Sequence, residues 1–122
     1  RGGVQKKRGR HQDALTLFHK ALALDPAHKP SRANCRDTLA ILGSIELKAG
    51  RINAAVAYFS EAIDMLPNAK DCNNLGACLG QLGQLDDAIA MFARAVDLDP
   101  DYVDARRNLE AAEQMKQQQE RP

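Results

Sequence analysis

The histidines and cysteines are the side chains best able to bind a metal or attack a substrate. They are His11, His19, His28, Cys35, Cys72 and Cys78. The cysteines form no CxxC pair, no histidine stands at a zinc-site spacing from them, and an HExxH motif is absent. We therefore expect surface histidines and buried free cysteines. The sequence predicts no enzyme activity, no cofactor and no metal.

Cysteine number and hydropathy indicate a cellular compartment. An odd number of cysteines without a framework of pairs is typical of reducing conditions, so we expect an intracellular, cytoplasmic protein. No apolar run approaches the roughly 20 residues that span a bilayer, and the polar amino end lacks the apolar segment of a signal peptide. Membrane insertion is therefore not expected. Because the sequence starts with Arg1 rather than methionine, we expect a part of a longer protein.

Charge is distributed unevenly along the chain. Residues 1–36 hold nine Lys or Arg and two acidic residues, a net charge of +7. Residues 37–122 hold eight Lys or Arg and fourteen acidic residues, a net charge of −6. The basic run consists of Lys6, Lys7, Arg8 and Arg10. It could contact an acidic partner, bind nucleic acid, or be a solvated helix end. Because no aromatic residues interleave with it to stack on bases, nucleic acid is not the expected partner.

The elements that would position any site are amphipathic helices. From Cys72 to Leu82 the apolar residues recur every three or four positions, which places them on one helix face. Gly83 interrupts this pattern, a second helical pattern runs to Leu98, and Asp99-Pro100 ends it. The stretch therefore predicts two antiparallel helices joined by a tight turn.

The same pattern occurs 33 residues earlier and, in part, once before that. Each copy has an alanine, an aromatic residue, a second alanine and a proline: Ala14, Phe18, Ala21 and Pro26; Ala55, Phe59, Ala62 and Pro67; Ala88, Phe92, Ala95 and Pro100. Leu42-Gly43 and Leu75-Gly76 precede the second and third copies. This pattern resembles the tetratricopeptide repeat, whose period is about 34 residues. The resemblance covers nearly the whole chain.

The resemblance implies an all-α fold, a right-handed superhelical solenoid of antiparallel helix hairpins. We expect one domain over residues 1–122, with a partial first repeat at 1–26, a second repeat with a lengthened first helix at 27–67, a third repeat at 68–101, and a capping helix with a polar tail at 102–122. Gly76 and Ala88 are expected where two paired helices face each other, with Phe92 filling the space beside them.

The second repeat is longer than the family pattern. Its interval from Pro26 to Pro67 is 41 residues, and the extra seven amount to about two helical turns. We favour a long helix over residues 31–48, started by a proline in its first turn and a cap at Ser31, over a disordered loop and a helix that begins near Arg36. The other predicted helices cover residues 10–24, 52–65, 69–82, 85–98 and 102 onward, with Gly9 ending an earlier helix.

Two further expectations concern burial. Glu46 falls where the next repeat has Leu79, and a buried unpaired carboxylate would be costly. It either reaches solvent or pairs with a base, and the sequence leaves both open. In the last helix the residues expected on one apolar side are Val103, Ala105, Leu109, Ala112 and Met115.

The family resemblance also implies where a partner would bind. In similar proteins the first helix of each hairpin lines a concave groove for a peptide or partner helix. The residues predicted to line it here are Ile41, Leu47, Lys70, Asn73, Asn74, Arg107 and Asn108. A subset of the family grips acidic chaperone tails with a clamp of Lys, Asn and Arg. Only Asn74 matches that clamp, while Ala40, Ser44, Asp104 and Asn108 depart from it, so such tails are not the expected ligand.

We therefore expect a non-catalytic scaffold that binds a protein segment or docks in a larger assembly. Two alternatives are a repeat region of a larger enzyme, such as a transferase, and a nucleic-acid-associated adaptor that uses the basic end. Because the first repeat is incomplete, part of its apolar face should be uncovered. Self-association or contact with another chain is expected there.

Overall fold

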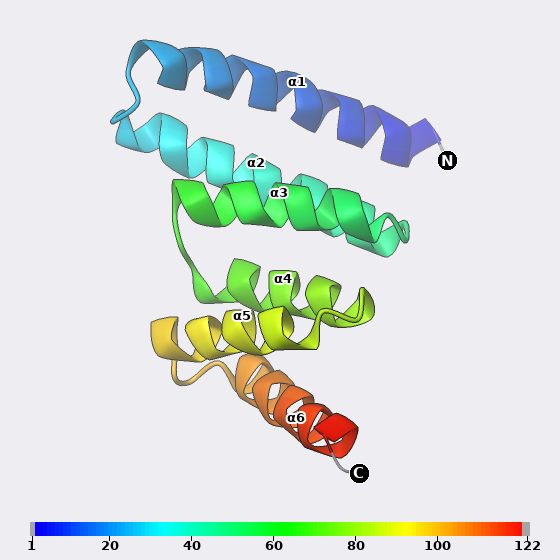
Figure 1. Ribbon diagram of the computed structural model, residues 1–122. Coiled ribbons are helices and arrows are strands. Elements are labelled where there is room, and N and C mark those ends of the chain that lie inside the picture. Colours follow the sequence, from blue (N-terminus) through cyan, green and yellow to red (C-terminus); the bar gives the residue numbers. More distant parts are fainter. Residues whose placement is uncertain (1, 121–122) are drawn as a thin grey trace. The chain divides into compact units, whose positions relative to one another are not determined.

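A computed structural model describes the backbone of residues 2–120 and the side chains of residues 7–28 and 31–120. The described backbone contains six helices and no strand (Figure 1). They are α1 (Gly2–Leu24), α2 (Lys29–Lys48), α3 (Ile52–Met65), α4 (Ala69–Gln81), α5 (Leu85–Leu98) and α6 (Val103–Glu120). The chain forms two compact units, Arg1–Leu66 and Pro67–Pro122, a division one residue from the predicted boundary between the second and third repeats. None of the described helices is long and apolar enough to cross a membrane.

In the first unit, α1 lies along α2, and α2 forms an antiparallel hairpin with α3 (Figure 1). The prediction that Gly9 ends an earlier helix is wrong, because α1 continues through it from Gly2 to Leu24. A glycine inside a helix costs only about 1 kcal/mol relative to alanine, and the packing of Leu15 and Leu22 against α2 residues such as Leu39 stabilises the helix that contains it.

The long second-repeat helix is confirmed, since α2 has 20 residues and starts at Lys29. Its cap differs from the prediction. The backbone N–H of Ser31 donates to His28 Nδ1 at 3.2 Å, so His28 is the N-cap and Ser31 lies within the first turn. The proline in that turn fits the prediction, because its missing N–H is one of the groups that a helix start leaves unpaired.

Both hairpins have the same contact between a glycine and a phenylalanine. A Cβ atom built on Gly76 in α4 would lie 2.7 Å from the ring of Phe92 in α5, and one built on Gly43 in α2 would lie 2.8 Å from the ring of Phe59 in α3. Only a hydrogen side chain leaves room for the ring at either position. The location of Gly76 at the contact between the paired helices agrees with the prediction. Ala88 is fully buried beside Phe92.

The turns of the two hairpins also match. Gly50 and Gly83 have φ angles of 83° and 80°, a left-handed conformation that glycine adopts without the steric cost of a Cβ atom. Helices α3 and α5 begin directly after them. Their bounds agree with the predicted ranges 52–65 and 85–98.

In the second unit, α6 packs against the hairpin of α4 and α5. Ala105 and Ala112 are buried in α6 as predicted, and Leu109 is half-buried. Val103 and Met115, which were expected on the same side of this helix, have side chains that are 51% and 52% exposed. A helix buries a stripe rather than a whole side, and a position outside that stripe stays in contact with solvent.

Candidate functional site

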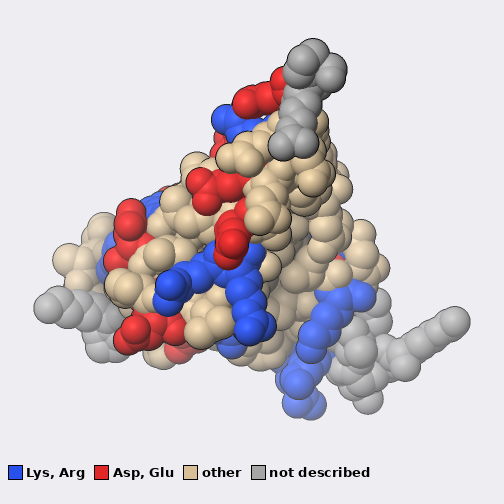
Figure 2. Space-filling model, turned by 90° about the horizontal axis from the view of Figure 1, so that it is seen from below, with Lys and Arg blue, Asp and Glu red and all other residues tan. Residues whose placement is uncertain are grey.

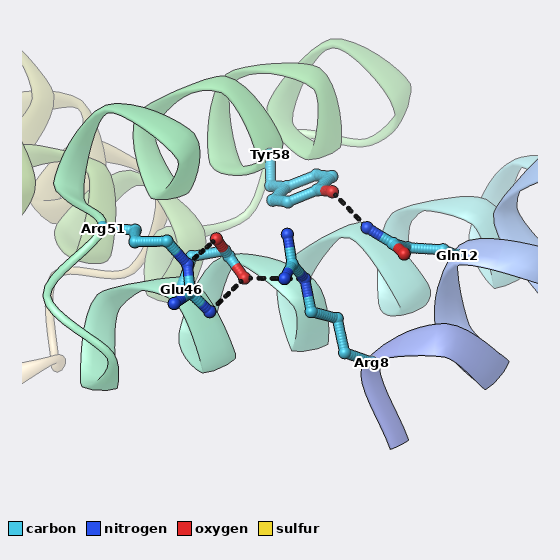
Figure 3. Close-up of polar contacts among 5 residues, drawn as sticks. All are labelled: Arg8, Gln12, Glu46, Arg51 and Tyr58. Carbon is cyan, nitrogen blue, oxygen red and sulfur yellow. Dashed lines mark hydrogen bonds and ion pairs between the residues drawn. The ribbon is translucent and has the colours of Figure 1, made fainter. Parts of the chain in front are cut away.

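Glu46 is the most unusual buried side chain in the first unit, because its carboxylate has no exposed surface. Two arginines surround it. Arg51 donates to it through Nε at 2.6 Å and through Nη2 at 3.1 Å, and Arg8 Nε lies 3.1 Å from Glu46 Oε1 (Figure 3). Of the two outcomes that the sequence left open, pairing with a base is the one observed.

The arginines also set the protonation of this carboxyl group. The hydrogen bond from Arg51 lowers the pKa of Glu46 below its ordinary value, burial acts in the opposite direction, and the positive charge of Arg8 adds to the lowering. Because α1 supplies Arg8, α2 supplies Glu46 and the turn before α3 supplies Arg51, the cluster joins three parts of the unit. Arg51 binds the carboxylate through two hydrogen bonds and Arg8 through an ion pair, so the cluster links these three parts of the chain.

The residues of the predicted basic run therefore have different environments. Arg8 is paired with Glu46, whereas Lys7 and Arg10 are exposed, and the side chain of Lys6 lies outside the described part. Close to Arg8, Gln12 donates to the hydroxyl of Tyr58 at 3.4 Å, which adds a second polar link between α1 and the hairpin (Figure 3). Contact of Lys7 and Arg10 with an acidic partner stays a prediction.

In the second unit, the polar residues predicted to line a groove lie on α4 and α6. Asn73 and Asn108 bond to each other, since Asn108 Nδ2 donates to Asn73 Oδ1 at 2.9 Å, and Asn73 Nδ2 donates to the Tyr102 hydroxyl at 3.4 Å. Asn73 is buried and Asn108 half-buried. These two amides therefore hold α6 against α4. The repeat pattern gave no signal for Tyr102 as the partner of Asn73.

The other three polar residues of that set have no partner within the described part of the chain. Lys70 and Arg107 are exposed and Asn74 is half-buried, and none of them makes an ion pair or a side-chain hydrogen bond there. Figure 2 shows basic and acidic side chains lying close together on the face seen from the α6 side. We call Lys70, Asn74 and Arg107, together with the exposed Met115, the α4–α6 surface. Met115 is not among the residues that the sequence predicts for the groove.

The two apolar residues predicted for the groove lie on α2 in the first unit. Ile41 is 41% exposed and Leu47 is half-buried. A partner could therefore reach Ile41. The structure describes each unit by itself, so a groove that joins these residues to the α4–α6 surface stays a prediction.

The cysteines and histidines show no arrangement for metal binding or nucleophilic attack in the described residues. Cys35, Cys72 and Cys78 are free and buried, and burial raises the pKa of each thiol, which disfavours the reactive thiolate. No group of three or more His, Cys, Asp or Glu side chains among residues with described side chains could hold a metal ion. His19 instead pairs with Glu61, with Nε2 2.7 Å from Oε1.

Solved structures with a similar fold include several repeat proteins. The crystal structure of MamA is 18% identical in sequence, with a TM-score of 0.62, and the match covers 92% of this chain and 82% of the MamA chain. YrrB, a TPR protein with an unusual peptide-binding site, is 21% identical, with a TM-score of 0.63 and coverage of 97% and 75%. The first TPR of Spaghetti (RPAP3), solved bound to the HSP90 peptide SRMEEVD, is 20% identical, with a TM-score of 0.59 and coverage of 93% and 86%. At these identities the likeness concerns the fold alone.

No curated protein sequence matches the chain. Two family models do match it, both described as tetratricopeptide repeat, one over residues 1–68 and the other over residues 69–102. Together they cover both hairpins and the glycine–phenylalanine contacts. The chain therefore belongs to the tetratricopeptide repeat family.

Proposed function

We propose that this protein is a non-catalytic interaction module that binds a segment of a partner protein on the α4–α6 surface. The observation that carries the proposal is the division among its polar side chains. Asn73 and Asn108 bond to each other and fix the two helices, whereas Lys70, Asn74 and Arg107 keep their donors free within the described residues. Membership of a repeat family whose members bind peptides supports the same role.

The chemistry of the surface indicates what the segment contains. Lys70 and Arg107 would attract a carboxylate, with Arg107 able to bind it through two parallel N–H groups. Asn74 can both donate to and accept from a peptide backbone. Helices α4 and α6 run in roughly the same direction (Figure 1), so Met115 lies toward the opposite end of the surface from Lys70. A bound segment that carries an acidic residue near Lys70 and an apolar residue near Met115 would fit this arrangement, in either chain direction.

A chaperone tail is a poor fit on the same grounds. Asp104 is exposed on α6 three residues before Arg107, and its carboxylate would repel a tail that carries several acidic groups. Asn108 is occupied by Asn73. We expect the peptide SRMEEVD to bind no more tightly than a scrambled peptide of the same composition.

Selection of short displayed peptides on the whole chain, followed by fluorescence polarisation, tests the proposal. The selected peptides should pair an acidic residue with an apolar one. Arg107→Ala should weaken their binding by about tenfold, which corresponds to about 1.4 kcal/mol. Arg106→Ala is the matched control, because Arg106 is an exposed arginine on the same helix that points in another direction.

Equal weakening by the two arginine variants would contradict the proposal, since it would indicate general attraction to positive charge. Asn74→Ala should weaken binding while leaving the thermal unfolding midpoint unchanged. Asn73→Ala should lower that midpoint, because it removes the bond between α4 and α6. If Asn74→Ala alters neither binding nor stability, the segment binds elsewhere.

A further inference from the structure

We propose that the outer face of α1 is the contact between two copies of this chain, packed as an antiparallel pair of α1 helices. This outer face consists of Arg10, Asp13, Leu17, Lys20 and Leu24, all of which are exposed. It lies on the first unit, so the inference does not depend on the α4–α6 surface.

The first argument is a difference in burial between equivalent residues. The alanine–phenylalanine–alanine series is fully buried in α3 and nearly so in α5, where the most exposed member, Phe92, is only 6% exposed. In α1 the same series, Ala14, Phe18 and Ala21, is only half-buried. In α3 and α5 a preceding glycine-bearing helix covers the series. The half-buried series in α1 therefore leaves apolar surface for a further contact.

The second argument is the exposure of two leucines. Leu17 and Leu24 are 65% and 90% exposed, more than any other large apolar side chain in the described part of the chain. They are seven residues apart, so they lie on one helix face about 10 Å from each other. Removing exposed apolar surface from water favours association, so a partner that covers both leucines at once would be bound through them.

The third argument identifies the occupant through charge. Asp13 lies four residues before Leu17 and Lys20 three residues after it. When two α1 helices pair antiparallel about Leu17, Asp13 of each copy faces Lys20 of the other, and both pairs form at once. Arg10 then lies opposite Leu24, which its aliphatic stem can cover. A parallel pairing would instead place like charges opposite each other, so the face is self-complementary only in a two-fold symmetric arrangement.

Small residues beside the leucines allow the two helices to approach. Ala14 lies three residues before Leu17 and Ala21 four residues after it, and their small side chains would not separate the helix axes. The contact covers only a few helical turns, which places it at the small end of specific interfaces. We therefore expect a reversible dimer with a dissociation constant in the micromolar range.

Sedimentation velocity of the whole chain over a concentration series, up to roughly 1 mM, tests the dimer. Leu17→Ser combined with Leu24→Ser should weaken association at least about tenfold without loss of helix content, because both side chains are already exposed. Leu98→Ser is the matched control. Leu98 is 45% exposed and occupies in α5 the position that Leu24 occupies in α1, and its replacement should leave association unchanged.

Charge reversal tests the antiparallel arrangement. Asp13→Lys alone and Lys20→Asp alone should each weaken the dimer several-fold, and the double variant Asp13→Lys/Lys20→Asp should restore it. A strict monomer at every concentration would overturn the proposal. So would a dimer that the two serine variants leave intact, which would place the contact on another surface, or single charge variants that have no effect.

Discussion

The two helical hairpins share one contact, and the residue three positions further along the first helix differs between them in charge. In both, a glycine admits a phenylalanine ring, at Gly43 with Phe59 and at Gly76 with Phe92. The first hairpin then has Glu46, fully buried and held by arginines, where the second has Leu79, packed against an apolar cluster. The contact within a hairpin is therefore constant, while the position that follows it can be ionic or apolar, depending on which partners the surrounding chain supplies.

The largest expected effect comes from breaking the constant contact. Gly43→Leu and Gly76→Leu should each lower the free energy of unfolding by about 1–3 kcal/mol or more, because even a Cβ atom would lie under 3.0 Å from a buried ring. Urea unfolding followed by circular dichroism measures this. Gly80→Ala is the control, since its Cβ atom would have 4.0 Å to the nearest atom, Ala88 Cβ. That variant should be neutral or slightly stabilising, and an unchanged midpoint for Gly76→Leu would contradict the contact.

The next largest effect on stability is expected from Glu46, which lies where the second hairpin has Leu79. Glu46→Leu makes the first hairpin resemble the second, but it leaves Arg8 and Arg51 without their carboxylate. We expect a loss of about 1–3 kcal/mol of stability in urea unfolding, although leucine supplies apolar surface. Glu61→Ala removes a half-exposed partner of His19 and should change stability by less than about 0.5 kcal/mol. A neutral Glu46→Leu variant would show that the ionic cluster can be replaced by an apolar contact.

A smaller and equal effect is expected in the two turns. Gly50→Ala and Gly83→Ala each place a Cβ atom on a backbone with φ near 80°, at a cost of about 1 kcal/mol. Neither added atom would meet another side chain within 4 Å among the described residues, so strain is the only contribution. If thermal unfolding of the two variants differs markedly, the turns are not equivalent.

The sequence predicted the parts of this fold that depend on local spacing. Helices α3 and α5, the turns at Gly50 and Gly83 and the contact of Gly76 with Phe92 follow from helical periodicity and residue size, which a single repeat displays by itself. The prediction that Gly9 ends a helix failed because it considered only local propensity. Whether Gly9 interrupts a helix depends on the packing of α1 against α2, and packing outweighs a propensity of about 1 kcal/mol.

The candidate site was predictable to a lesser degree. The repeat pattern placed Asn73, Asn74 and Asn108 on neighbouring helices, but it could not tell which amides bond to each other, since that depends on the distance between α4 and α6. Pairing of Arg8 with Glu46 joins residues 38 positions apart in the sequence, and no local pattern reports such a contact. The exposure of Met115 likewise depends on where the buried stripe of α6 ends.

The smallest effect tests the charge of Glu46 through pH. Its pKa is lowered in the folded chain, first by the hydrogen bond from Arg51. As the pH falls through the ordinary carboxyl value, about 4.3, the unfolded chain binds a proton before the folded chain does. The contribution of Glu46 to stability is therefore fully present above that pH and is lost as the pH falls through the lower folded-state pKa.

Comparison of the wild-type chain with Glu46→Gln isolates this contribution. The difference in their unfolding free energies should be constant near neutral pH and should shrink below about pH 5, because glutamine does not titrate. Glu61→Gln is the control, and its difference from the wild type should stay small across the range. Because Glu46 is buried, added salt should weaken its contribution less than that of an exposed pair. A difference between wild type and Glu46→Gln that is independent of pH would mean that the carboxylate gains nothing from its arginines, and the first hairpin would then differ from the second in shape alone.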